Sequence, residues 1–409
     1  MTDTAQSPAH AAAQALADVF DEARALATVT ALCTPVMSGR SLGSAGHDRA
    51  TRLLEDVLAS YGLTPRLDAF PIREVMRLAE QPTCHADGPM LSRSLVHRAE
   101  YAEHPRSGPM PAPVTGTVAA AEDATAGQWA ALLEVPQGDA FADLAAQLTN
   151  RGAVGILTPQ NADGSGFLTK RVQGAAPVEL PVVAVRPDLL SAAVGGELTA
   201  HVQLLREPAT GTNIIATLPG SNPDARPVLL TAHYDGVGSD PELHFPCAGD
   251  NASGTAVLCE AARVLSQAAP LPRPVIFALV DAEELGTLGS RHHAKQLTGQ
   301  SLTPDVLNVD MAGKFNGKVA IELGPADPQP KSLIAALDAS GRQLRIPLYA
   351  APVSSDNRRY AQAGFAAAGI GLGAAHYHSP LDAVERIDPD ALRKAGQLVL
   401  ATIYRLTQP

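Results

Sequence analysis

From residue 212 onward, short apolar runs alternate with longer stretches whose apolar residues recur at helical spacing. The runs that predict strands are TNIIATLPG, PVLLTAHYD, PVIFALVDAEE, VLNVDMAG, KVAIELG and AAGIGLG. The stretches that predict helices are NASGTAVLCEAARVLSQA, SRHHAKQLT, PKSLIAALDASG and PDALRKAGQLVLATIYRL. Strand–helix alternation is typical of a parallel sheet covered by helices on both faces. This part of the chain therefore predicts an α/β fold with a mostly parallel central sheet.

The N-terminal part, residues 10–60, predicts mainly helix. Its clearest segment is ATRLLEDVLASYGL (50–63), where Gly62 supplies a stop signal. The apolar residues of that segment recur at helical spacing: Leu53, Leu54, Val57, Leu58 and Tyr61. The glycine- and serine-rich run VMSGRSLGSAGHDRA lies between the helical stretches and predicts a loop.

The middle of the chain has a different pattern. No clear periodicity appears from about 75 to 112, and EHPRSGPMPAP predicts a turn-rich boundary. Beyond it, VTGTVAAAE, AVGILTP, LPVVAVRP and LTAHVQLL predict strands, and FADLAAQLTNRG predicts a short helix. We therefore expect a smaller β-rich domain at 76–207, inserted into a discontinuous domain formed by 1–75 and 208–409.

Bulk properties restrict the class of protein. The chain has 409 residues, of which 45% are hydrophobic and 18% are charged, as in ordinary globular proteins. Its formal net charge of -11 argues against nucleic acid and anionic membranes as partners, because both require basic patches. No apolar run reaches the length of a membrane span.

The N-terminus and the cysteines bear on location. The start MTDTAQSPAHAAAQALADVFDEA lacks a basic stretch followed by an apolar core, so we expect no signal peptide. The four cysteines are widely spaced and form no C-x-x-C pair. These features favour a reducing compartment, and the cytoplasm in particular. Secretion would be the interpretation if a leader precedes this chain in its native form.

Polar residues with metal-binding chemistry follow the predicted strands. His233 and Asp235 come after PVLLTA, and residues two apart on a strand point the same way. Asp310 ends the strand VLNVD. Either segment alone is better explained by a polar strand end or a turn. Together they gain weight, because an open α/β sheet binds its ligands beyond the carboxyl ends of its strands.

Three acidic residues extend the set. Glu283 and Glu284 follow the apolar strand PVIFALV, and adjacent side chains there point in different directions. One could bind a metal while the other reaches a metal-bound water; a solvated acidic loop is the alternative. Asp250 opens a predicted helix in GDNASG, where Asp250 or Asn251 could instead be the N-cap.

Two histidines complete the candidates. His376 and His378 flank Tyr377 after AAGIGLG, and His378 is the preferred ligand of the two. The set then holds two histidines and three carboxylates, with one glutamate to spare. Mixed nitrogen and oxygen ligation without thiolate suits Zn²⁺, with Mn²⁺ or Co²⁺ as substitutes. Five ligands exceed one tetrahedral zinc with an open position, but they suit two Zn²⁺ ions that share a bridging carboxylate.

The five segments resemble, in order, those of the co-catalytic two-zinc exopeptidases, a family that includes bacterial leucyl aminopeptidases and plasma glutamate carboxypeptidase. The stretch SGRSLGSAGHDRATRLLEDVLASYGLTP resembles that family's opening helix–loop–helix. The block 76–207 resembles the protease-associated (PA) domain inserted in many members, most clearly at GAVGIL and PVVAVRPD. The resemblance therefore covers most of the chain and implies a zinc-aminopeptidase fold.

Carried over by motif, the resemblance implies two zinc sites that share Asp250. His233 and Asp310 would complete one site, and Glu284 and His378 the other. One departure from the family pattern is Gly249, because members usually have two acids before the asparagine. Only the second acid matches the bridging position, so we expect both sites to be intact.

The resemblance also implies roles around the metals. Glu283 would be the general base, Asp235 would support His233, and Tyr377 would stabilise the oxyanion, as a tyrosine does in some members. A cis peptide often follows the bridging aspartate, here between Asp250 and Asn251. The implied activity is hydrolysis of peptide bonds in peptide substrates, most specifically as an aminopeptidase.

The sequence also allows other functions. A carboxypeptidase-type member would need basic residues in its pocket, for which the candidates are Arg345, Arg358 and Arg359. A non-catalytic scaffold that holds a partner is a further alternative, although the intact ligand set argues against it. The inserted domain could gate the cleft, set substrate size or mediate homodimerisation. His292 and His293 are expected on the surface of their helix.

Overall fold

The computed structural model describes residues 8–173, 176–324 and 330–408. The chain forms two compact units. The first unit comprises residues 1–72, 209–238 and 244–409, and the inserted unit comprises 73–208 together with 239–243. The short excursion at 239–243 has no counterpart in the boundaries expected from the sequence.

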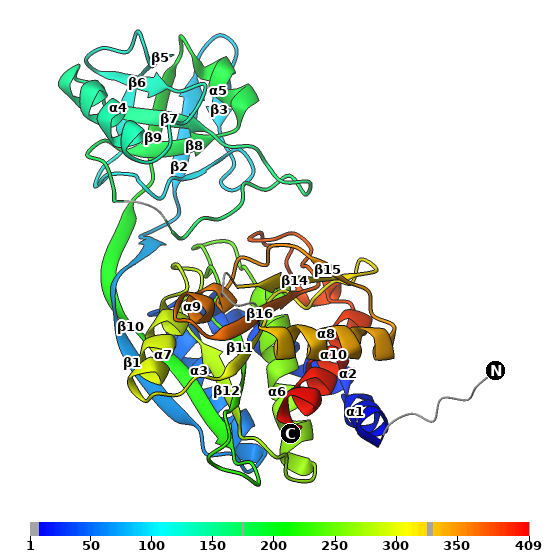
Figure 1. Ribbon diagram of the computed structural model, residues 1–409. Helices are drawn as coiled ribbons and strands as arrows, with labels where there is room; N and C mark the ends of the chain where they lie inside the picture. Colours follow the sequence, from blue (N-terminus) through cyan, green and yellow to red (C-terminus); the bar gives the residue numbers. More distant parts are fainter. Residues whose placement is uncertain (1–7, 174–175, 325–329, 409) are drawn as a thin grey trace. The chain divides into compact units, whose positions relative to one another are not determined.

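The first unit is built on an eight-stranded sheet (Figure 1). Its strands, in spatial order, are β1 (Arg66–Leu78), β10 (Leu204–Leu218), β12 (Val275–Val280), β11 (Val228–His233), β13 (Asp305–Val309), β16 (Ala366–Gly371), β14 (Val319–Leu323) and β15 (Leu348–Ala350). The four central strands, β12, β11, β13 and β16, are mutually parallel. Because β10 and β14 pair antiparallel with their neighbours β12 and β16, the sheet is mostly rather than wholly parallel.

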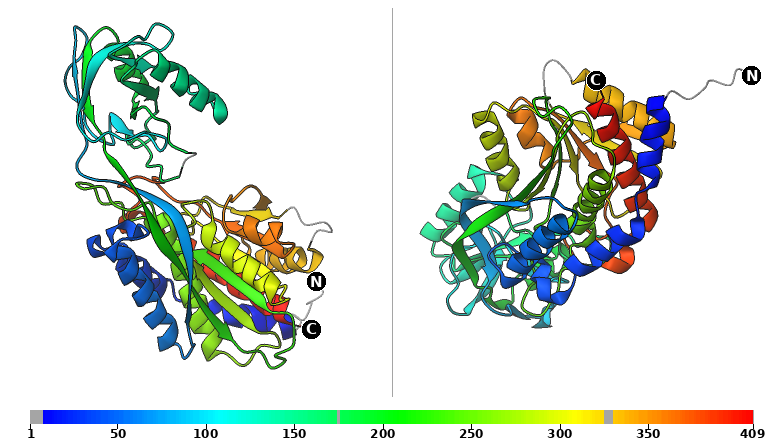
Figure 2. Two further views of the ribbon diagram at one scale, coloured as in Figure 1. Left: turned by 90° about the vertical axis from the view of Figure 1, so that its left-hand side faces the viewer. Right: turned by 90° about the horizontal axis from the view of Figure 1, so that it is seen from below.

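Helices cover both faces of this sheet (Figures 1 and 2). One face packs against α2 (Glu22–Leu32), α3 (Ala45–Ser60), α6 (Ser253–Gln267), α8 (Lys331–Leu344) and α10 (Pro389–Thr407). The other packs against α7 (Leu288–Gly299) and α9 (Asn357–Gln362). Leu229 and Leu230 of β11 enter opposite cores, as the alternation of side chains along a strand requires. This confirms the expected α/β fold class.

The remaining helical segments of the first unit are α1 (Pro8–Asp18), η1 (Pro35–Arg40), η2 (Ala248–Ala252) and η3 (Val384–Arg386). Two helical segments, η1 and α3, extend into sequence that was expected to be a loop. The glycine-rich run after residue 35 contains η1, and α3 begins at Ala45 rather than at residue 50. The early start follows from capping, because the Ser44 side chain accepts a hydrogen bond from the His47 backbone N–H.

The inserted unit contains a second eight-stranded sheet. Its strands, in spatial order, are β3 (Ser92–Ser94), β2 (Thr83–Asp87), β9 (Glu197–His201), β5 (Val114–Ala120), β6 (Gln128–Ala131), β7 (Gly155–Pro159), β8 (Val182–Val185) and β4 (Tyr101–Glu103). Its helices are α4 (Asp139–Asn150) and α5 (Pro187–Ala193). Strands β2, β3 and β4 lie in the region without clear sequence periodicity. The expected strand LTAHVQLL is in fact divided between β9 and β10.

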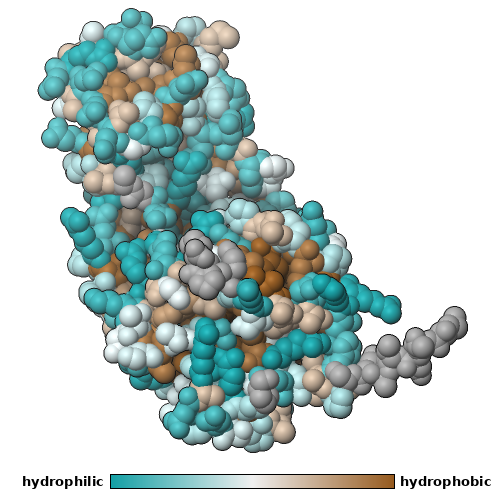
Figure 3. All heavy atoms as spheres, in the orientation of Figure 1, coloured by the Kyte–Doolittle hydropathy of each residue, from teal (hydrophilic) through white to brown (hydrophobic). Residues whose placement is uncertain are grey.

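The surface seen in Figure 3 is mainly hydrophilic, with hydrophobic residues in separate patches. Large exposed hydrophobic side chains include Met90 and Leu133, each 80% exposed. Scattered exposures of this kind are ordinary on globular proteins. Among the helices in the described ranges, none has the length and apolar character needed to cross a bilayer.

A buried charge network anchors the excursion 239–243 within the inserted unit. The Asp240 carboxylate accepts hydrogen bonds from Arg98 Nε at 2.6 Å and from Lys170 Nζ at 2.7 Å. Arg98 also donates to Glu103. All four side chains are buried. Removing one partner from a buried pair leaves the other charge uncompensated, at a cost of about 3–5 kcal/mol.

We expect Asp240→Asn to destabilise the inserted unit at neutral pH and much less in acid. Burial alone would raise the pKa of Asp240, but Lys170 and Arg98 outweigh it and hold that pKa below its usual 3.8. The stabilisation is therefore present above the unfolded pKa and is lost as the pH falls below about 3.8. Urea unfolding of wild type and variant across this range measures the difference. Asp188→Asn, which breaks an exposed pair with Arg186, is the control, with an expected cost below about 1 kcal/mol. An equal loss at every pH would contradict this account.

Candidate active site

The sequence-predicted metal ligands come together beyond the carboxyl ends of the parallel strands. His233 is the last residue of β11, and Asp310 directly follows β13. Glu284 lies four residues after β12 ends at Val280. The other two candidates lie outside the sheet: Asp250 is in η2, and His378 is in the segment after β16. Both reach the same place as the first three.

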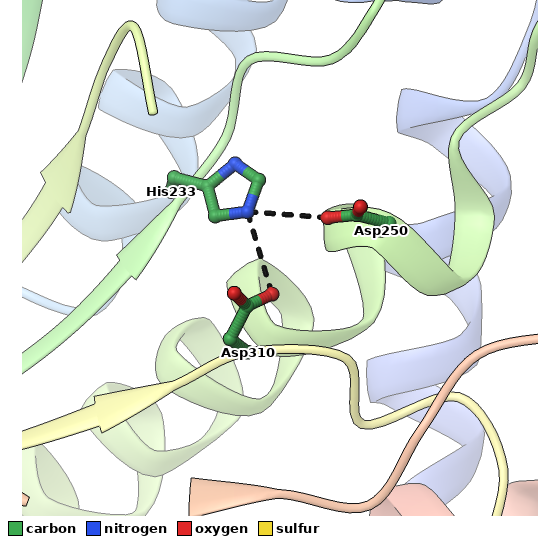
Figure 4. A group of neighbouring side chains, drawn as sticks. All are labelled: His233, Asp250 and Asp310. Carbon is green, nitrogen blue, oxygen red and sulfur yellow. Dashed lines mark ion pairs between the residues drawn. The ribbon is translucent and has the colours of Figure 1, made fainter. Parts of the chain in front are cut away.

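The first group consists of His233, Asp250 and Asp310 (Figure 4). The Nε2 atom of His233 lies 3.3 Å from Asp250 Oδ1 and 3.4 Å from Asp310 Oδ1. All three residues are buried. Figure 4 shows both carboxylates directed at the same ring nitrogen, from η2 and from the end of β13.

The second group consists of Asp250, Glu284 and His378. The Nε2 atom of His378 lies 3.3 Å from Asp250 Oδ2 and 2.9 Å from Glu284 Oε2. Asp250 therefore contributes one carboxylate oxygen to each group. A carboxylate placed between two sets of ligands in this way can bridge two cations.

The unsatisfied atoms of the site fit a bound metal. The buried atoms that lack a hydrogen-bond partner within the described part of the chain include Asp310 Oδ1, Glu284 Oε1 and His233 Nε2. Buried polar atoms without partners are costly, so they indicate an additional ligand. Ligands about 2.0–2.2 Å from a tetrahedral zinc are about 3.3–3.6 Å apart, which matches the separations of 3.3 and 3.4 Å around His233.

Asp235 connects the ends of two ligand-bearing strands. Its Oδ1 accepts a hydrogen bond from the Glu283 backbone N–H at 3.1 Å, and its Oδ2 accepts one from Glu284 at 3.2 Å. Its Oδ1 also lies 3.4 Å from Nδ1 of His233. A carboxylate at this nitrogen fixes the tautomer of a metal-binding imidazole, so the position of Asp235 agrees with the supporting role expected for it.

Asn251 organises the backbone on either side of Asp310. Its Nδ2 donates to the carbonyl of Val309 at 3.1 Å, and its Oδ1 accepts from Met311 N–H at 3.1 Å. The same oxygen accepts from Gly254 N–H at 3.0 Å. The capping function considered for Asp250 thus falls to Asn251, which leaves the Asp250 carboxylate for the cluster. The peptide between the two residues is cis, as the resemblance implied.

Glu283 lies beside the ligand groups and is partly exposed. Its pKa is raised well above the usual value, mainly by burial and further by the carboxylates of Asp356, Asp310 and Glu284, while His233 opposes the shift. A carboxyl group that is drawn toward its protonated form next to a metal site can both take up and release a proton.

Tyr377 is the most exposed of the expected catalytic residues, at 48%. Its ring stacks on the His378 imidazole with centroids 3.7 Å apart. Burial of the phenol and the nearby carboxylates raise the pKa of Tyr377, so the hydroxyl stays protonated near neutral pH. It is therefore available as a hydrogen-bond donor at the edge of the site.

The three candidate specificity arginines already have partners or lie at a helix end. Arg358 pairs with Glu322 at 2.7 Å, and Arg359 donates to Thr287 Oγ1 at 2.5 Å. Arg345 follows the last residue of α8. These contacts disfavour a pocket that binds a substrate carboxylate through these side chains.

Several buried residues in this region make contacts whose partners the sequence did not identify. Asp356 accepts a hydrogen bond from Ser290 Oγ at 2.5 Å, and burial raises its pKa to about 7. Arg40 and Asp382 contact the backbone that leads to Asp250. His293, expected on the surface, is buried and bonds through Nδ1 to the Tyr360 hydroxyl. Local sequence cannot locate such contacts, because their partners are far away in the chain.

Comparisons with known proteins relate this fold and site to metallopeptidases. Residues 213–403 match the family model described as Peptidase family M28. Aminopeptidase YwaD of Bacillus subtilis is 29% identical over 269 residues, covering 62% of this chain and 57% of the relative. A probable zinc metalloprotease of Pyrenophora tritici-repentis is 36% identical over 125 residues, covering 30% of this chain and 25% of the relative.

Solved structures share the fold over almost the whole chain. The zinc aminopeptidase BSAP from Bacillus subtilis superimposes with a TM-score of 0.74 at 24% identity, covering 95% of this chain and 96% of that one. The aminopeptidase from Aneurinibacillus sp. strain AM-1 has a TM-score of 0.72 at 20% identity, covering 97% and 96%. The inserted unit is therefore included in the structural likeness.

Proposed function

We propose that this chain is a zinc-dependent aminopeptidase that releases N-terminal residues from peptides. The observation that carries the proposal is Asp250, which contributes one oxygen to each of two ligand groups while Glu283 lies beside them. This arrangement suits two ions that share a bridging carboxylate. His233 and Asp310 would hold one ion, and Glu284 and His378 the other. Zn²⁺ fits the donor set best, with Mn²⁺ or Co²⁺ as substitutes.

The residues around the ligands have distinct roles in the proposed hydrolysis. Bound zinc would supply Lewis acidity, which lowers the pKa of a bound water and polarises the scissile carbonyl. Glu283 takes the proton of the attacking water and later delivers it to the leaving amine. Tyr377 donates a hydrogen bond to the developing oxyanion. Asp235 keeps the His233 ring in the orientation that ligation needs.

Three features support the aminopeptidase proposal over a carboxypeptidase type. The relatives named above are described as aminopeptidases and zinc metalloproteases. Arg358 and Arg359, which the carboxypeptidase type would need for a substrate carboxylate, are bonded to Glu322 and Thr287. The many carboxylates of the site also suit the positively charged α-amine of a peptide N-terminus.

Further parts of the proposal concern the rest of the molecule. The inserted unit is proposed to be PA-like, on the basis of its β-rich sheet and the sequence likeness at GAVGIL and PVVAVRPD. All four cysteines are free and buried, which supports a reducing compartment such as the cytoplasm. Peptides are the proposed partners. Homodimerisation through the inserted unit is a further proposal.

The test compares matched dipeptides with free and acetylated N-termini, using chelated enzyme before and after zinc is restored. We expect zinc-dependent cleavage of the free-amine substrates alone. Equal cleavage of the blocked substrates would favour the carboxypeptidase type. Absence of both cleavage and metal binding would leave the non-catalytic scaffold as the explanation.

A further inference from the structure

Arg40 makes an unusual set of contacts for a charged residue. It is completely buried and has a left-handed backbone conformation, with φ at 53°. Its guanidinium donates to the carbonyls of Tyr234 at 2.7 Å, Pro246 at 2.9 Å, Cys247 at 2.7 Å and Leu32 at 3.1 Å. Three of these four carbonyls belong to the segment that joins the ligands His233 and Asp250.

The neighbouring glycine lets Arg40 reach that segment. A Cβ atom on Gly39 would lie 2.6 Å from the carbonyl oxygen of Phe245 and 2.9 Å from the backbone of Gly238. Gly39 also accepts a hydrogen bond from Gly238 N–H at 3.2 Å. The end of η1 is therefore packed backbone to backbone against the segment that carries Asp250. Any side chain at position 39 would force the two segments apart.

Asp382 holds the same segment from its other end. Its Oδ1 accepts from Gly249 N–H at 2.7 Å, and its Oδ2 accepts from Asp250 N–H at 3.1 Å. Its backbone carbonyl accepts from Ala248 N–H at 3.1 Å. Asp382 is buried and lies four residues after the ligand His378. It therefore fixes the backbone of the shared ligand to the loop that supplies another ligand.

The two buried charges act on consecutive peptide groups. Arg40 binds carbonyls at 246 and 247, and Asp382 binds amides at 249 and 250. Burying a charge is costly unless hydrogen bonds compensate it, and this stretch of backbone supplies two of the four carbonyls that bind Arg40 and two amides that bind Asp382. Both residues thus restrain the position of Asp250, whose two oxygens must each face a different ligand group.

We infer that Arg40 and Asp382 are positioning residues that fix the shared ligand Asp250 and so allow two metal ions to bind together. The inference rests on the proposed two-metal function. Neither residue reaches the ligand groups through its own side chain; each acts through the backbone. Loss of supporting contacts behind metal ligands typically weakens metal binding about 10–100-fold.

The experiment compares Arg40→Lys and Asp382→Asn with the matched control Arg49→Lys. Lysine keeps the charge but not the planar set of donors that reaches several carbonyls. Arg49 lies in the same region and is exposed; within the described residues its side chain donates only to the Val36 carbonyl, at 3.0 Å. Zinc affinity and stoichiometry of the chelated proteins are measured by competition with a chromophoric chelator, and folding by circular dichroism and thermal unfolding without metal.

We expect both variants to fold and to bind zinc about 10–100-fold more weakly, with the second ion affected most, while Arg49→Lys binds as wild type. Folded variants with wild-type affinity for two ions would overturn the inference. Failure of both variants to fold without metal would also overturn it, because the pair would then serve the fold rather than the site.

The result also separates this inference from the proposed activity. If wild type binds two ions but cleaves no peptide, the aminopeptidase proposal fails, while weakened binding in the variants still supports the positioning role. If wild type binds fewer than two ions, the two-metal site and the positioning role both fail.

Discussion

Glu283→Gln is expected to lower kcat by about 10²–10⁴-fold while leaving the bound metal unchanged, because the role proposed for this residue is proton transfer and not metal binding. Its carboxyl group lies outside both ligand groups, and its raised pKa reflects burial and the surrounding carboxylates. Glutamine keeps the shape of the side chain and removes its capacity to accept a proton. The loss should therefore appear in turnover and not in metal content.

The measurement pairs steady-state kinetics on a free-amine dipeptide with elemental analysis of the purified protein. Glu284→Gln is the informative contrast, because it alters a proposed ligand one residue away and should lower metal content as well as activity. Exposed Glu385→Gln should match wild type in both assays. Near-full activity of Glu283→Gln would refute its assignment as general base.

The sequence predicts the convergence of three of the ligands because they follow the ends of strands. Once β11, β12 and β13 are parallel neighbours, His233, Glu284 and Asp310 must emerge at one edge of the sheet. Asp250 and His378 lie on loops, so their arrival at that edge required the resemblance rather than the pattern. Each ligand-bearing segment alone has an ordinary explanation. The prediction of a metal site depends on the occurrence of five such segments in succession along the chain.

Other features depend on contacts that local sequence does not encode. The antiparallel pairing of β10 with β12 is a long-range contact that the apolar pattern of β10 does not specify. The sequence pattern places His293 on the surface of its helix, whereas in the structure its ring bonds to the hydroxyl of Tyr360. Arg40, in a glycine-rich loop, acquires its role only when residues about two hundred positions away pack around it.

The shared position of Asp250 leads to the second large effect, which concerns metal stoichiometry. Asp250→Asn should abolish tight binding of both ions, because each of its oxygens faces a different group. Asp310→Asn should weaken only the ion near His233, because Asp310 belongs to one group alone. The two substitutions are chemically identical, so a difference in outcome reflects position and not the loss of a charge.

Thermal and chemical unfolding with and without zinc measures this asymmetry. An ion that binds only the folded state adds about 2.7 kcal/mol to the free energy of unfolding when its free concentration is 100 times its dissociation constant. Wild type should gain from two ions, Asp310→Asn from one and Asp250→Asn from neither. Equal gains in the two variants would mean that Asp250 binds a single ion. The site would then hold either one ion, or two ions that share no ligand. The ranking of the three proteins thus tests the bridge directly, without relying on any substrate.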